Sequence, residues 1–109
     1  MDNQISEIFS QNKILLRNLK TLDFGEFSKK RTYKLFIGVD KNSLYTLVFM
    51  REAKSRFIKK EFDELEHITR LVEAKFDTNI KKLILLYRSE ICSKVIKNAN
   101  KDWKFYAFM

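Results

Sequence analysis

Two short segments of this chain are apolar on both faces of an extended strand. Residues 44–50 read LYTLVFM, with one threonine as the polar exception, and residues 83–86 read LILL within a longer segment over 80–87. Strands that are buried on both sides lie in the interior of a sheet that helices cover. The two segments therefore predict an α/β fold with a sheet at its centre.

The remaining periodicities place helices and further strands around these two segments. Apolar spacings of three and four predict helices over residues 5–22, 58–76 and 91–99. Alternation predicts a half-buried strand over 33–39, and a last strand covers 103–108. The predicted order is α-β-β-α-β-α-β, with helices flanking a four-stranded mixed sheet. Its first strand is antiparallel and its second to fourth strands are parallel.

Length and composition favour one domain over residues 1–109. A chain of this length buries about two-thirds of its unfolded surface, which suffices for one core. Cys92 is the single cysteine and has no partner for an intramolecular disulfide, so a reducing cytoplasm is the expected location. The first residues lack a signal-peptide pattern, and the apolar runs are too short to span a bilayer. No membrane partner is expected.

Positive charge is concentrated in particular segments. The net charge is +8, yet residues 28–60 hold ten Lys and Arg against two acids, and residues 61–77 hold two against six. In the predicted sheet, the second and third strands end at the edge where the first begins. The cations expected at this edge, called the basic rim, are Lys29, Lys30, Arg31, Arg51, Lys54, Arg56 and Arg88.

The opposite edge of the predicted sheet collects the turns at Asp40, Asp77 and Asp102, so we expect it to be acidic or mixed. The basic rim lies beside two helix N-termini, which add partial positive charge and unpaired N–H groups. These features favour binding of a DNA or RNA phosphate backbone, or of an acidic protein. The alternative is a solvated face at the start of the second predicted helix, on which the cations of residues 51–60 are neutralised by pairs with the acids at 61–66.

Glu52 and Lys54 suggest a second function. A Glu-x-Lys pair at a strand end is used by metal-dependent nucleases, in which the carboxylate holds Mg²⁺ and the lysine stabilises developing charge. Asp40 lies at the other end of the strand, more than roughly 20 Å away at 3.3 Å per residue. The residue opposite Glu52 falls near Thr32, which is not an acid.

A magnesium site would therefore require carboxylates from other segments, namely Glu26, Glu52 and Glu90, to meet at the rim. No cofactor is expected outside this alternative.

The third hypothesis is a protein-interaction module or a homodimer that pairs through its last strand. That strand carries four aromatic residues, which stack on unpaired bases if one face is bare. Packing in the core is the favoured interpretation for them. They are Trp103, Phe105, Tyr106 and Phe108.

Overall fold

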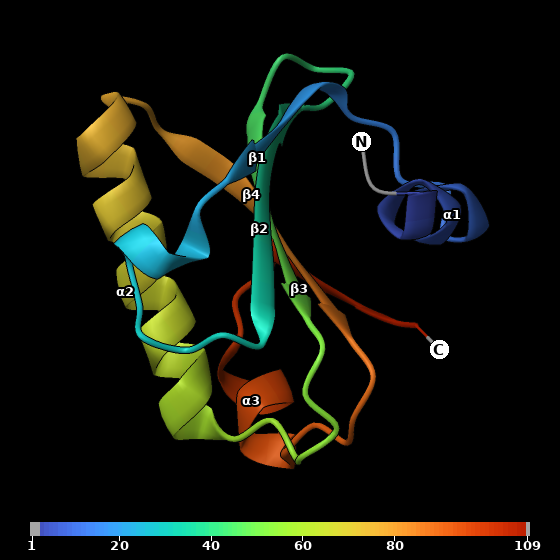
Figure 1. The fold of residues 1–109 in the computed structure, drawn as a ribbon, viewed down its shortest axis with the longest axis vertical. Helices are drawn as coiled ribbons and strands as arrows, with labels where there is room; N and C mark the ends of the chain where they lie inside the picture. The colour runs from blue at the N-terminus through green and yellow to red at the C-terminus, as the bar shows by residue number, and fades with distance from the viewer. Residues whose placement is uncertain (1–2, 109) are drawn as a thin grey trace.

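A five-stranded mixed sheet forms the centre of the computed structural model, which describes residues 3–108 (Figure 1). The strands follow one another across the sheet in chain order. They are β1 (Arg17–Leu22), β2 (Tyr33–Val39), β3 (Tyr45–Arg51), β4 (Ile80–Tyr87) and β5 (Trp103–Ala107). The pairs β1-β2 and β2-β3 are antiparallel, whereas the pairs β3-β4 and β4-β5 are parallel. The α/β class, the hairpin and the parallel crossovers predicted from the sequence are confirmed.

Helices cover both faces of this sheet (Figure 1). On one face lie α2 (Lys59–Phe76), the short α3 (Ser93–Asn98) and the 3-10 turn η1 (Phe24–Glu26). The other face is covered by α1 (Asn3–Gln11). Successive side chains of a strand point to opposite faces. Phe49 therefore packs in the core beneath α2, while Val48 packs beneath α1, which explains why β3 is apolar on both sides.

The helix predicted over residues 5–22 is wrong in its second half. The helix α1 ends at Gln11, Lys13 adopts a left-handed φ of 57°, and the chain then forms β1. The apolar spacing of this segment also fits an edge strand, whose Leu19 packs toward α1 and whose Leu22 packs toward α2. Pairing with β1 gives hydrogen-bond partners to the backbone of β2. The sheet therefore has five strands, not four.

No helix among residues 3–108 combines the length and the apolar character that crossing a membrane requires.

Candidate nucleic-acid interface

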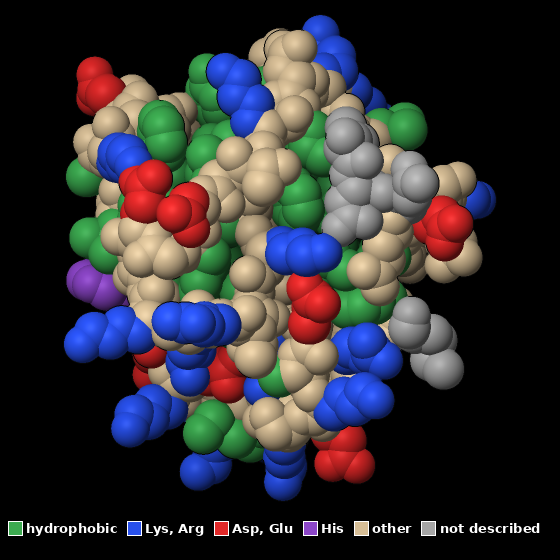
Figure 2. All heavy atoms as spheres, viewed as in Figure 1, with side chains coloured by type: hydrophobic (Ala, Val, Ile, Leu, Met, Phe, Trp, Pro, Cys, Tyr) green, Lys and Arg blue, Asp and Glu red, His purple; other side chains and the backbone are tan. Residues whose placement is uncertain are grey.

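The segments that carry the basic rim lie at one end of the sheet. Tyr33 at the start of β2 pairs with Arg51 at the end of β3, and Met50 pairs with Leu86 near the end of β4. The connections that flank these strand ends therefore share this end. Figure 2 shows Lys and Arg side chains gathered there, at the lower end of the view, with some acidic side chains among them. Six of the seven predicted rim residues are exposed or half-buried: Lys29, Lys30, Arg31, Lys54, Arg56 and Arg88.

Arg51 is the exception, because its side chain is buried and only 1% of the residue is exposed. Its Nε and Nη2 donate to the two carboxylate oxygens of Glu61 at 2.7 and 3.2 Å. Its Nη1 donates to the carbonyl of Ser55 at 2.7 Å and to Oγ of Ser89 at 2.8 Å. The prediction that Arg51 contacts phosphate is corrected by this burial. Arg51 instead ties the end of β3 to α2 and to the end of β4.

The buried cluster around Arg51 also contains Tyr33, whose hydroxyl donates to Glu61. Burial and the adjacent Glu61 carboxylate raise the pKa of Tyr33 above its usual value, so the hydroxyl keeps its proton. Burial alone would raise the pKa of Glu61, but the hydrogen bonds from Arg51 and Tyr33 outweigh it and lower that pKa. The positive charge of Lys30 lowers the pKa of Glu61 further.

Several acids near the basic rim already have partners. Asp63 forms an ion pair with Lys59 within the first turns of α2, and Glu64 accepts a 3.5 Å hydrogen bond from Ser28. Glu52 lies 3.7 Å from the ammonium nitrogen of Lys34. The acids at 61–66 therefore pair mainly with Arg51 and Lys59. Neither of these is among the six exposed or half-buried rim residues.

The three carboxylates proposed for a magnesium site do not meet. Glu26 forms an ion pair with Lys75 near the far end of α2, whereas Glu90 lies in a shallow pocket at the basic rim. The amide of Glu52 donates to the carbonyl of Thr32 at 2.8 Å, so Thr32 lies opposite Glu52, as predicted. Within residues 3–108, no three His, Cys, Asp or Glu side chains are grouped closely enough to hold a metal ion. The predicted metal site is not assembled.

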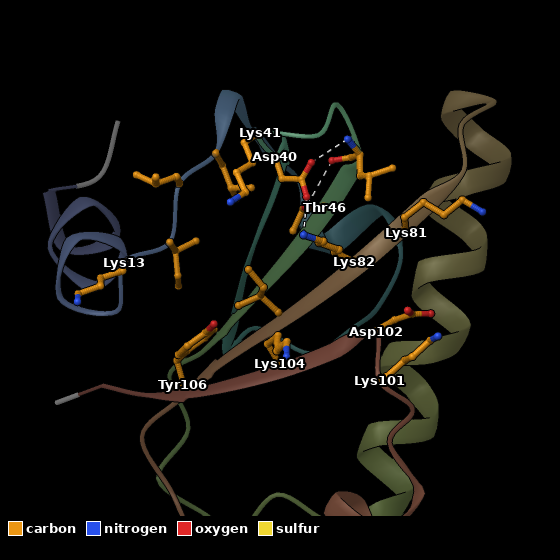
Figure 3. Close-up of a pocket in the computed structure, with 15 residues that line it drawn as sticks. Lys13, Asp40, Lys41, Thr46, Lys81, Lys82, Lys101, Asp102, Lys104 and Tyr106 are labelled. Carbon is orange, nitrogen blue, oxygen red and sulfur yellow. Dashed lines mark hydrogen bonds and ion pairs between the residues drawn. The ribbon is translucent and has the colours of Figure 1, made fainter.

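The opposite end of the sheet is mixed in charge, one of the two outcomes expected, and the groove that opens there has more lysines than aspartates in its lining. A groove of about 520 Å³ opens on the α1 side of the sheet (Figure 3). Asp40, one of its two aspartates, pairs with Lys82 at 2.5 Å and accepts the amides of Asn42 and Leu44. We call this feature the lysine groove, after the six lysines that line it: Lys13, Lys41, Lys81, Lys82, Lys101 and Lys104.

The acids of these turns, taken by themselves, gave no sign of this groove. Alternation within β4 and β5 was the available signal. Ile84 pairs with Lys104, so Lys82 and Lys104 lie on the same face of neighbouring strands.

Comparison with solved structures finds a similar fold in the structure of an EndoMS complex with double-stranded DNA. The TM-score is 0.54 at 13% sequence identity, over 96% of this chain and 43% of that chain. This chain thus spans less than half the length of that one. No protein-family model and no curated protein matches the chain. At this level of sequence identity the likeness is one of fold alone.

Proposed function

We propose that this protein binds nucleic acid through the phosphate backbone, using the exposed part of its basic rim. The observation that carries the proposal is the strand register. Because β2 starts where β3 and β4 end, the cations before β2, after β3 and after β4 share one end of the molecule. Lys30, Lys54 and Arg88 represent these three segments. A surface that gathers cations from separate segments attracts polyanions over a range set by the ionic strength.

The start of α2 supports the same ligand. Ile58 precedes this helix of 18 residues and has no polar side chain with which to cap it. The first N–H groups of a helix lack partners within the helix and carry partial positive charge, which suits a phosphate oxygen. Lys59 and Lys60 occupy the first turn, where helix electrostatics disfavour cations. A nearby anionic ligand offsets that cost.

Backbone recognition is the proposed mode, since the rim residues come from loops and strand ends and present separate positive charges. Such contacts position a ligand without reading its sequence. The fold likeness to a chain solved with double-stranded DNA makes a DNA duplex the first ligand to test. Affinity is then expected to fall steeply with salt, because each neutralised phosphate releases condensed counterions.

Salt dependence of duplex binding tests the proposal. If about five phosphates are neutralised, the slope of log K against log salt lies near −4 to −5. The double variant K54A/R56A is expected to flatten this slope by about two units, since each lost contact removes roughly 0.9. A charge-matched control, K20A/R70A, removes two exposed cations from β1 and α2 and leaves the slope near the wild-type value. Equal slopes for the two variants would refute the assignment of the rim.

DNA cleavage is the alternative at the same end of the sheet. Glu52 and Lys54 are both exposed there, but Thr32 occupies the position opposite Glu52 where a second carboxylate is needed. We expect binding without cleavage. Incubation with plasmid DNA and Mg²⁺ tests this: cutting by the wild type that is lost in E52Q would establish the enzyme instead.

A further inference from the structure

The lysine groove lies at the end of the sheet opposite the basic rim, on the side that α1 covers. Its floor and walls come from neighbouring strands. Ile84 of β4 pairs with Lys104 of β5, and Leu86 pairs with Tyr106, so these side chains share one face. Figure 3 shows Tyr106 and Lys104 on β5, across the groove from Asp40 and Lys41. The groove is therefore part sheet surface and part charged turns.

The charge of the groove favours a ligand with several phosphates. Six lysines and two aspartates line the groove, but Figure 3 shows the ammonium ends of Lys13 and Lys81 pointing away from its centre, which leaves four lysines against two aspartates and a formal excess of two positive charges. Asp40 contributes little free negative charge, because Lys82 and two backbone amides already bind its carboxylate. Asp40 has a pKa below its usual value, chiefly because of the hydrogen bond from Lys82, so it stays ionised in this pair.

The lysines come from separate turns and strand starts around the opening, rather than converging on one point. This spacing fits successive phosphates of a chain better than a single small anion.

Tyr106 adds an aromatic surface to the same groove. Of the four aromatic residues of the last strand, Trp103 and Phe108 are buried in the core and Phe105 packs toward α2. Tyr106 is half-buried and lines the groove beside Ile84. An aromatic ring next to cations is the combination that holds unpaired bases and their backbone. A duplex hides its base faces in the stack, so only a single strand can use such a ring.

We propose that the lysine groove binds single-stranded nucleic acid, with lysines on the phosphates and a base stacked on Tyr106. Its volume of about 520 Å³ is within the range of roughly 300–1,000 Å³ that ligand sites occupy. The site is distinct from the basic rim: the rim contacts the outside of a duplex, and the groove receives an unpaired strand. The two surfaces can therefore be tested independently.

Fluorescence anisotropy measures how tightly the protein binds a labelled oligothymidylate. A length of about 12 nucleotides is within the range of single-strand site sizes. Y106L keeps an apolar side chain against the α1-side core but removes the ring. It is expected to weaken binding of the oligonucleotide by about five-fold to 150-fold, the range for one stacked base. Y106F keeps the ring and retains the affinity. K41A/K104A is expected to flatten the salt slope for the single strand by about 1.4 units.

The outcomes separate this inference from the proposed function. If Y106L and K41A/K104A both have wild-type thermal midpoints and bind oligothymidylate as tightly as the wild type, the lysine groove is not the binding site for a single strand. Competition by thymidine monophosphate at the same concentration as the oligonucleotide also overturns it, because the site then recognises a mononucleotide. Loss of duplex binding in K54A/R56A, with single-strand binding retained, supports two surfaces. If K54A/R56A does not change duplex binding, the proposed role of the basic rim is refuted, and the proposal for the lysine groove is unaffected.

Discussion

Removal of the Glu61 carboxylate, in the variant E61A, is expected to destabilise the protein strongly. Glu61 binds the buried guanidinium of Arg51 through two hydrogen bonds of 2.7 and 3.2 Å, and it also accepts the hydroxyl of Tyr33. Loss of one partner leaves a buried charge uncompensated, which costs about 3–5 kcal/mol. For a domain of this size, 3 kcal/mol lowers the thermal midpoint by roughly 12 °C or more. Thermal and urea unfolding followed by circular dichroism measure both quantities.

Two comparisons sharpen this prediction. E7A removes an exposed carboxylate of α1 and is expected to change the free energy of unfolding by less than about 0.5 kcal/mol. R51M/E61L replaces both charges with apolar side chains and is expected to recover much of the stability that E61A loses. It should also keep the wild-type salt slope for duplex binding, since Arg51 is placed inside the fold. A free energy of unfolding for E61A within about 1 kcal/mol of the wild type refutes the reasoning.

Three further perturbations test other parts of the account. Hydrogen bonds hold the pKa of Glu61 below its usual value of 4.5, so the stability they give is present above that pH and is lost as the pH falls through the lowered pKa. Urea unfolding from about pH 5 to about pH 3 is expected to show this loss, and a wild-type-like decline in E61Q would contradict it. Asp77 ends α2 with a left-handed φ of 48°, so D77G is expected to raise the free energy of unfolding by about 0.5–1 kcal/mol, whereas a lower value argues against strain there. Phe49 is 0% exposed and stacks on Trp103; F49A is expected to cost about 3–5 kcal/mol in urea unfolding, against less than about 1 kcal/mol for Y45A at the exposed start of the same strand.

Strands whose neighbours bury both faces could be predicted closely from the sequence. The strands at 33–39 and 80–87 have the predicted bounds, because alternation or continuous apolar character is a local property of the segment. The segment 17–22 could not be assigned in this way. Its apolar spacing fits a helix as well as an edge strand, and the decision rests on pairing with β2, which lies outside the segment.

The candidate site shows the same division between topology and local detail. The rim follows from strand direction, so residues 29–31, 54–56 and 88 could be placed together from the sequence. The burial of Arg51 depends on the first turn of α2 reaching back to the end of β3, which periodicity does not reveal. The lysine groove was missed because Lys82 and Lys104 are far apart in the chain and meet only through the register of β4 and β5.

The most direct measurement of the central claim is a map of backbone amide chemical shifts during titration with a short DNA duplex. The perturbed amides are expected to cluster at residues 29–31, 54–56 and 88–90, and those of the second half of α2 are expected to stay unchanged. Perturbations confined to one of these segments, or centred on the middle of α2, would contradict a shared phosphate-binding surface at the end of the sheet.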